Sequence, residues 1–175
     1  MAWKDNLLKS INDPNLIKFK DDKVVIIEDL YPKSECHYLV IPYEDILNIQ
    51  SLQRQHLSTL YYMDELARNF AYNFKGKNMW LGYHAKPSMN RLHLHLISDD
   101  FNGQGLKHKK HYNSFTTPFF IASSKVIHDV KQFGRVLLPS DSECDIYLKT
   151  ALKCHKCKYN PINMPTLKLH LLTHL

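Results

Sequence analysis

The sequence predicts an α+β fold in which helices flank an antiparallel sheet and a small separate unit follows at the C-terminus. Three observations support this prediction. Apolar segments of strand length occur in pairs in the middle of the chain, segments with apolar residues at helical spacing lie on either side of them, and the connections are short. With 175 residues, the chain can bury one sizeable core and carry a small appendage.

The N-terminal half is expected to begin with a helix and a pair of strands. Residues 3–11 have apolar residues at helical spacing, and this pattern ends before an Asp-Pro pair. Residues 23–30 and 36–42 are apolar runs that predict two paired strands, with the turn sequence YPKSE between them. A long helix is expected over about 52–74, where leucines and aromatic residues fall near helical spacing.

The rest of the sheet is predicted from residues 79–84 and 91–97. These segments form another antiparallel pair, joined by the sequence AKPSMN. Residues 99–120 are basic and are expected to form a loop, and a further helix is expected near 124–133. Together these elements give a sheet that is mainly antiparallel, with helices around it.

The octapeptide RLHLHLIS, residues 91–98, alternates leucine with basic side chains. In an extended strand, successive side chains point to opposite faces, so the leucines should face the core. Arg91, His93 and His95 should then share the other face. One interpretation is an ordinary half-buried strand with histidines on its outer face, and the other is a rigid surface that presents two imidazoles for chemistry.

The C-terminal segment CHKCKYNPINMPTLKLHLLTH carries the strongest local motif. Its spacing, Cys-x2-Cys-x12-His-x3-His, is that of a Cys2His2 zinc finger. The predicted zinc ligands are Cys154, Cys157, His170 and His174. Leu167 and Leu171 are expected to form a miniature core under the metal, and His155 is expected to be solvated. Zinc binding can supply about 10–16 kcal/mol towards folding so short a unit.

The two parts of the chain differ in composition and charge. The sequence at 139–142, Pro-Ser-Asp-Ser, is typical of a linker, so we expect domains over 1–138 and 139–175. Residues 1–100 hold 12 Lys and Arg against 13 Asp and Glu, whereas residues 101–175 hold 11 against 4, a net charge of +7. A basic C-terminal part indicates a polyanionic partner, and nucleic acid is favoured over a membrane surface.

The charged start lacks the pattern of a secretory signal, so we expect an intracellular protein with reduced thiols.

Residues around the octapeptide complete a known pattern. The sequence GYHAKPSMN supplies His84 and Ser88, and DLYPKSECHYLVIP supplies Asp29 and His37. This set resembles the histidine-triad (HIT) superfamily of nucleotide hydrolases and transferases, except that Arg91 stands where the first histidine of the triad would be. The segments WKDNLLKSINDP and LKHKKHYNSF and the zinc finger extend the resemblance over nearly the whole chain. They are similar to the DNA-repair members, which remove AMP from adenylated 5′ DNA ends.

The resemblance implies a HIT-type antiparallel sheet and a reaction in two steps through a covalent adenylyl-histidine, with no metal needed for catalysis. His93 would be the nucleophile, with its second ring nitrogen donating to a backbone carbonyl of the neighbouring strand. The expected catalytic residues are His93, His95, His84 and Ser88. The expected nucleotide-binding residues are Ile27, Asp29, Leu30, His37 and Met89, with Asp29 accepting from ribose hydroxyls.

The resemblance also implies contacts to DNA. The expected DNA-binding residues are Trp3, Lys107, Lys109, Lys110 and His111. Trp3 would stack on the terminal base pair, and the basic residues would hold phosphates. The expected partner is a nicked or broken duplex with an adenylated 5′ end, with RNA–DNA junctions as a further candidate and AMP as the product. We expect a nuclear monomer with no membrane partner.

Two other functions are compatible with these residues. A general HIT hydrolase would act on dinucleoside polyphosphates or AMP-lysine, with the zinc finger purely structural. A degenerate HIT scaffold would bind DNA through the finger without catalysis, an alternative motivated by Arg91. The charge of the C-terminal part and the position of Trp3 favour a DNA-end hydrolase, because a mononucleotide substrate needs neither.

Overall fold

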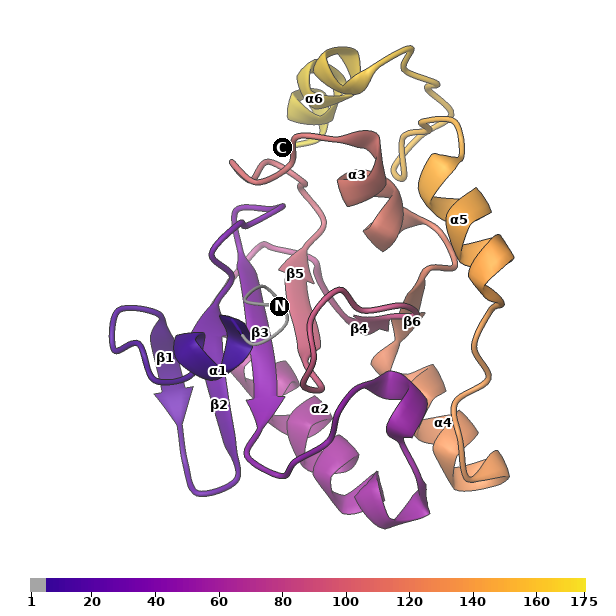
Figure 1. Ribbon diagram of the computed structural model, residues 1–175. Helices are drawn as coiled ribbons and strands as arrows, with labels where there is room; N and C mark the ends of the chain where they lie inside the picture. The colour runs from indigo at the N-terminus through magenta and orange to yellow at the C-terminus, as the bar shows by residue number, and fades with distance from the viewer. Residues whose placement is uncertain (1–5) are drawn as a thin grey trace.

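An antiparallel sheet flanked by helices forms the centre of the computed structural model, which describes residues 6–175 (Figure 1). Within these residues the sheet has the strands β1 (Ile17–Lys20), β2 (Val24–Glu28), β3 (His37–Pro42), β4 (Met79–His84), β5 (Leu94–Ser98) and β6 (Phe120–Ala122). Their order is β1-β2-β3-β5-β4-β6, and each neighbouring pair is antiparallel. The predicted α+β fold is therefore confirmed.

The two predicted strand pairs are present. In the β2–β3 pair Val25 lies opposite Ile41, and in the β4–β5 pair Gly82 lies opposite His95. The structure adds β1 and β6 at the two edges of the sheet, which the sequence patterns did not reveal. It also shortens the histidine-bearing strand, which begins at Leu94 and not at the expected residue 91.

The helices depart from the predictions in three places. The described helices are α1 (Asn6–Ser10), α2 (Leu57–Ala71), α3 (Lys109–Thr116), α4 (Ser123–Phe133), α5 (Asp141–Lys149) and α6 (Met164–Leu171), with the short 3-10 helices η1 (Ile49–Ser51), η2 (Arg54–His56) and η3 (Leu172–His174). The predicted long helix begins later than expected, because two 3-10 turns precede it. The expected basic loop contains α3, and α5 begins inside the expected linker, where Ser140 and Glu143 cap its start reciprocally.

The two faces of the sheet have different partners. On one face, Ile26, Val40 and Leu94 belong to the main core together with residues of α2 and α4. The alternate residues of the same strands point the other way, where Val25 and Leu39 pack with residues of α1. His93 and His95 lie on this second face and are only 6% and 4% exposed. The strand is thus buried on both faces, and the interpretation with histidines on a solvated face is wrong.

The C-terminal segment packs against the body of the protein. Leu167 and Leu171 are buried as predicted, but the core they join is shared with Phe101 and Tyr112 and is not a miniature core of the segment alone. This cluster draws residues from both sides of the expected boundary at 138/139. Among residues 6–175 no helix combines the length and apolarity that crossing a bilayer requires.

Candidate active site and zinc site

A cavity of about 670 Å³ opens on the histidine-bearing face of the sheet. Its walls come from the ends of β2 and β4, from β3 and β5, and from α3. The predicted site residues that line it are Ile27, Asp29, Leu30, His37, His84, Ser88, Met89, His93, His95, Lys107, Lys110 and His111. Residues from distant parts of the sequence therefore meet at one site, as the family resemblance implied.

Two predicted DNA-binding residues are not among the described residues around the cavity. Lys109, the first residue of α3, is exposed and is not among the described residues that line the cavity. Trp3 lies outside the described residues. The cavity also has lining residues that were not predicted, including Lys33, Lys86, Phe115 and Leu148. Lys33 was detectable in principle, because it lies in the turn that follows Asp29.

The imidazole of His93 is oriented by a backbone carbonyl. Its Nδ1 lies 2.8 Å from the carbonyl oxygen of Arg91. A carbonyl can only accept, so Nδ1 carries the proton and Nε2 keeps its lone pair. The acceptor is two residues earlier in the same segment, and the expectation of a carbonyl from the neighbouring strand is wrong. The result is still an unprotonated ring nitrogen, the state that a nucleophile requires.

Arg91 does not share the face of His93, contrary to the prediction. Its backbone is in the left-handed region, with φ of 91°, so the alternation of the strand does not extend to it. The guanidinium instead donates to the carbonyls of Pro42 and Tyr43, and Arg91 is absent from the described residues around the cavity.

Three polar groups in series fix the protonation of His95. The backbone N–H of Lys33 donates to Nδ1 of His37 over 3.2 Å, so His37 carries its proton on Nε2. That nitrogen lies 3.0 Å from Nδ1 of His95 and donates to it. The proton of His95 is therefore on its own Nε2, which is buried and has no hydrogen-bond partner among the described residues. A buried N–H without a partner at the wall of the cavity is a candidate donor to a ligand.

The hydrogen bond from Lys33 to His37 also decides against a metal ion at this place. Ligand atoms of Asp29, His37 and His95 lie within 4.8 Å of one another, a separation compatible with a metal. Metal ligation would need a lone pair on Nε2 of His37, and the N–H of Lys33 already holds the lone pair on the other nitrogen. His37 and His95 are instead joined by a hydrogen bond, and Asp29 lies 3.6 Å from Nε2 of His37.

Burial keeps the clustered imidazoles neutral. Removal from water lowers the pKa of His37 to about 4, and it also lowers the pKa of His93. The pKa values of His84 and His95 are lowered further for the same reason, with neighbouring imidazoles adding to the effect. The rings of His84 and His95 have centroids 4.4 Å apart. Neutral imidazoles can act as nucleophile and hydrogen-bond donor at neutral pH.

Asp29 and Lys33 influence each other electrostatically at the edge of the cluster. Burial acts to raise the pKa of Asp29, but its electrostatic interactions with His37 and Lys33 and a 2.7 Å hydrogen bond from the N–H of Tyr31 outweigh it, so the pKa is lowered overall. Burial lowers the pKa of Lys33, and Asp29 opposes this shift. The carboxylate is thus ionised and able to accept hydrogen bonds from a ligand.

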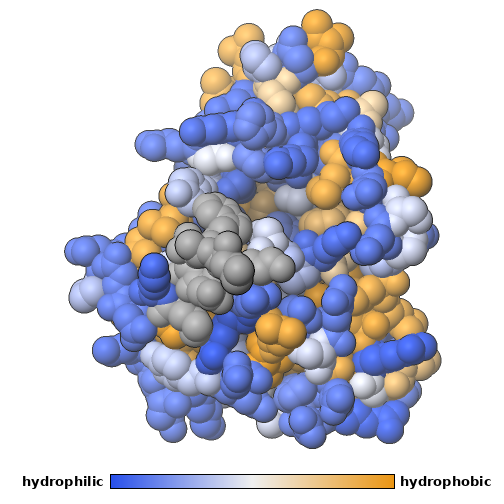
Figure 2. Space-filling model, viewed as in Figure 1, coloured by the Kyte–Doolittle hydropathy of each residue, from blue (hydrophilic) through white to orange (hydrophobic). Residues whose placement is uncertain are grey.

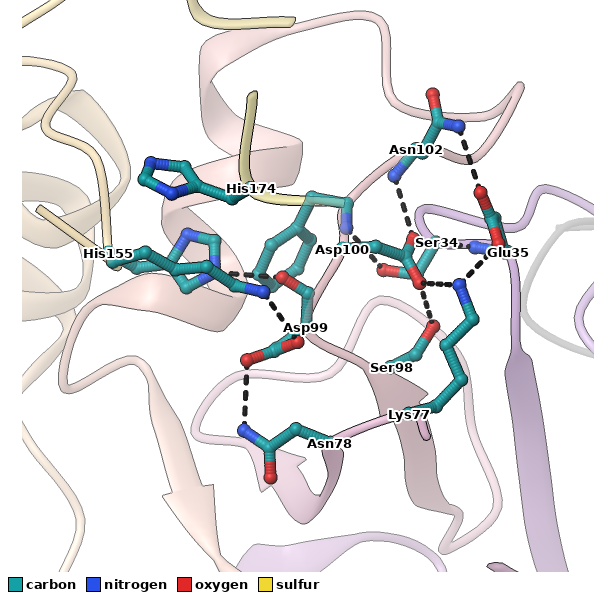
Figure 3. A network of polar contacts seen from close by, with 12 residues as sticks. Ser34, Glu35, Lys77, Asn78, Ser98, Asp99, Asp100, Asn102, His155 and His174 are labelled. Atoms are coloured by element: carbon teal, nitrogen blue, oxygen red, sulfur yellow. Dashed lines mark hydrogen bonds and ion pairs between the residues drawn. The ribbon is translucent and has the colours of Figure 1, made fainter. Parts of the chain in front are cut away.

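A polar network supports the side of the cavity that bears Lys33, Lys107 and Lys110, and Figure 3 shows this network. Asp100 accepts from the backbone N–H groups of Glu35 and Asn102, and the hydroxyl of Ser34 accepts from the N–H of Phe101. Gly105 lies so close to the carbonyl of Tyr31 that a side chain there would overlap it. These contacts join the turn that bears Lys33 to the segment that leads into α3. In Figure 2 a band of hydrophilic residues crosses the face of the molecule that is shown, below the C-terminal segment.

The four predicted zinc ligands converge. The Sγ of Cys154 is 3.5 Å from Nε2 of His174, the Sγ of Cys157 is 3.2 Å from Nε2 of His170, and the two Nε2 atoms are 3.2 Å apart. A tetrahedral zinc ion with ordinary bond lengths would place such atoms roughly 3.3–3.6 Å from one another. Two thiols and two imidazoles at these separations fit zinc.

His155 connects this group to the sheet (Figure 3). Its Nε2 donates to the backbone carbonyl of Asp99 over 2.8 Å, and the hydroxyl of Tyr112 lies 2.9 Å from its Nδ1. The next residue, Lys156, forms a 3.0 Å ion pair with the carboxylate of Asp99. The expectation that His155 is solvated is wrong, because it is a docking residue between the two parts of the chain.

The sheet with its histidine cluster and the appended Cys2His2 group define a histidine-triad protein that carries a zinc finger. Family models agree with this class. Residues 2–111 match the family described as "Scavenger mRNA decapping enzyme C-term binding", and residues 116–175 match the family described as "C2HE / C2H2 / C2HC zinc-binding finger".

The chain belongs to the aprataxin family, as the resemblance indicated. It is 41% identical to aprataxin of Gallus gallus over 98% of this chain and 55% of the relative, so it spans about half the length of that protein. It is 32% identical to the aprataxin-like protein of Saccharomyces cerevisiae, over 98% of this chain and 95% of the relative. The crystal structure of the aprataxin ortholog Hnt3 in complex with DNA superimposes with a TM-score of 0.78 at 25% identity, covering 98% and 94% of the two chains.

Proposed function

We propose that this protein hydrolyses the adenylate from 5′-adenylated DNA ends and leaves a 5′-phosphate. The observation that carries the proposal is the state of His93, whose Nδ1–H is engaged by a carbonyl while Nε2 keeps a lone pair at a cavity large enough for a nucleotide. The relationship to aprataxins, and the structures of Hnt3 with DNA and with DNA and guanosine, support a nucleic-acid substrate.

In the first step, Nε2 of His93 attacks the adenylate phosphorus. A P–N bond forms, and the bond from phosphorus to the bridging oxygen breaks, so the DNA leaves with a 5′-phosphate. Negative charge spreads over the non-bridging oxygens of the adenylate. The Nε2–H of His95 has no partner among the described residues and would donate to one of these oxygens. Ser88, in the loop after β4, is a second donor on the cavity wall.

The role of His84 follows from its burial. The low pKa of this imidazole disfavours a protonated acid waiting to protonate the departing phosphate. We therefore assign His84 to hydrogen bonding and to packing against His95 and Phe115, whose ring centroids lie 4.4 and 4.6 Å away. Lys33, Lys107 and Lys110 line the same cavity and would offset the charge of the departing phosphate.

In the second step, water attacks the phosphorus of the adenylyl-histidine. A P–O bond forms, the P–N bond breaks, AMP leaves, and the displaced proton passes to solvent. His93 regains its lone pair, because its Nδ1–H stays on the carbonyl of Arg91. Asp29 is the ionised acceptor for the ribose hydroxyls, and Ile27, Leu30 and Met89 would contact the adenine ring.

The Cys2His2 group belongs to DNA binding in this proposal. Bound zinc would hold the finger folded, and the reaction itself takes place at the histidine cavity. Lys153, Lys158 and Lys168 are exposed on or beside the finger and would contact phosphates. Trp3 remains the predicted stacking residue, and a nuclear location follows from a role in DNA repair.

The proposal is tested by single-turnover release of AMP. The substrates are a nicked duplex with a 5′-adenylate, a dinucleoside polyphosphate and AMP-lysine. We expect release from the nicked duplex to be fastest by about 100-fold or more, because only that substrate uses the basic rim and the finger. Equal rates on all three substrates would favour a general nucleotide hydrolase, and no release from any of them would leave a binding module.

A further inference from the structure

We infer that Arg91 is a positioning residue that sets the tautomer of the nucleophilic histidine from outside the cavity. The inference deepens the proposed function, on which its kinetic part rests. It concerns a residue that stands where a histidine is usual in the HIT motif, and that is not among the described residues lining the large cavity.

The backbone of Arg91 needs to be held. Its φ of 91° is uncommon for a residue with a side chain, and such a conformation persists only where the surroundings impose it. This conformation is what turns the carbonyl of Arg91 towards Nδ1 of His93. A relaxed backbone with negative φ would rotate the peptide and remove the acceptor.

The side chain supplies the restraint. One guanidinium nitrogen, Nη2, donates to the carbonyls of both Pro42 and Tyr43, and Nε lies 3.3 Å from the carbonyl of Pro42. The backbone N–H of Arg91 donates to the carbonyl of Leu47 over 2.7 Å. The arginine side chain is only 14% exposed. The fork of the guanidinium therefore closes the loop after β3 onto the residue whose carbonyl orients His93.

The contacts of the Arg91 guanidinium differ in strength. Asp45 also approaches Nη1 of Arg91 at 3.3 Å, but its side chain is 95% exposed, so this ion pair is screened by water. The bonds to the carbonyls are largely covered and use the planar geometry of arginine, which a lysine ammonium cannot reproduce. Arg91→Lys should keep the charge and lose most of the restraint.

The first readout is the tautomer of His93, measured by the ¹⁵N chemical shifts of its ring in the free protein. In the wild type we expect an unprotonated Nε2 and a protonated Nδ1. Arg91→Ala should give a mixture of tautomers, and Arg91→Lys should give an intermediate state. A single Nδ1–H tautomer in both variants would overturn the inference. This measurement needs no substrate, so it stands apart from any failure of the proposed activity.

The second readout is single-turnover AMP release from the adenylated nick. A misplaced nucleophile should lower kcat on the order of 10-fold to 100-fold in Arg91→Ala with little change in KM, and less in Arg91→Lys. Arg54→Lys is the matched control, because Arg54 also donates to a carbonyl, that of Gln132, and neither residue is among the described residues lining the cavity. Asp45→Asn should resemble the wild type. A kcat for Arg91→Lys equal to that of Arg54→Lys would contradict the inference, even if Arg91→Ala fails to fold.

Discussion

The cavity and the zinc finger both gather imidazoles, and the two sets are held by different means. In the cavity, backbone groups of Arg91 and Lys33 set which ring nitrogen of His93 and His37 carries a proton. In the finger, the Nε2 atoms of His170 and His174 face each other and two cysteines across a few ångströms. The first set is held by hydrogen bonds to backbone groups, and the second gathers two sulfur and two nitrogen atoms at separations that fit a metal ion.

The two sets of residues therefore serve different ends: the cavity residues serve the reaction, and the finger residues serve folding and docking. The residues around the cavity are held by strands that pack on a large core, so the direction of each ring nitrogen is fixed and can serve the reaction. The finger spans few residues and shares its core with Phe101 and Tyr112, so it depends on the metal and on docking. Substitutions in the cavity should change rate, and substitutions in the finger should change affinity and stability.

The largest effect is expected from His95. His95→Phe removes an N–H that we propose donates to the adenylate in the transition state, and loss of one such donor typically lowers kcat by about 10²–10³-fold. Single-turnover AMP release measures this effect, with His128→Asn on the exposed side of α4 as the control. A kcat within twofold of the wild type would show that His95 does not stabilise charge.

Removal of zinc should act mainly on affinity. Cys157→Ser, or chelation, deprives the finger of a ligand set that contributes about 10–16 kcal/mol to folding such units. We expect DNA affinity to fall by roughly tenfold or more, since several phosphate contacts are lost, with a smaller change in hydrolysis of free nucleotides. Fluorescence anisotropy with labelled nicked DNA measures it, with Cys36→Ser, a cysteine outside the ligand set, as the control. Equal losses in both assays would contradict the division of roles.

The pH dependence should come from the cavity. The pKa of His37 is about 4 in the folded protein against about 6.5 for an ordinary histidine. The unfolded chain therefore binds more protons between these values, and stability should fall as pH drops from about 6.5 to 4. The pKa of His93 is also lowered, so AMP release should persist below pH 6.5. Urea unfolding and rates across pH 4–8 test this, and a loss of rate centred above pH 7 would contradict it.

The smallest effect is expected at the docking contact. His155→Phe keeps the ring packing against Trp80 and Phe101 but leaves the carbonyl of Asp99 without its donor. A lost hydrogen bond of this kind costs about 1–3 kcal/mol, or roughly 2–10 °C in Tm for a chain of this size. Zinc content should stay unchanged, and Lys158→Met is a surface control. Loss of zinc in His155→Phe would show that the ligand set is misassigned.

Local patterns were sufficient for the central strands and for the convergence of the four predicted zinc ligands. Runs such as those of β2 and β4 match their strands closely, and the spacing of the finger specifies its geometry. Helix α3 was hidden in a basic segment, although Tyr112 and Phe115 at helical spacing were a usable signal. The capping pair Ser140 and Glu143 likewise marked the start of α5.

Features set by tertiary contacts were beyond the sequence. Arg91 was expected on the face of the strand because alternation was extended past its true start. Its left-handed backbone depends on carbonyls of Pro42, Tyr43 and Leu47, which lie far away in the sequence. Lys33 reaches the cavity because the segment before α3 packs against its turn. Such placements follow from packing, and no local pattern encodes them.

The most direct test of the account is to trap the covalent intermediate. The protein is mixed with a 5′-adenylated nick, quenched in denaturant within the first turnover, and its peptides are examined by mass spectrometry. We predict one AMP group on the peptide that contains His93 and none in His93→Ala, with AMP release in that variant lowered by roughly 10³-fold or more. Adenylation of another residue, or AMP release from His93→Ala at the wild-type rate, would contradict it.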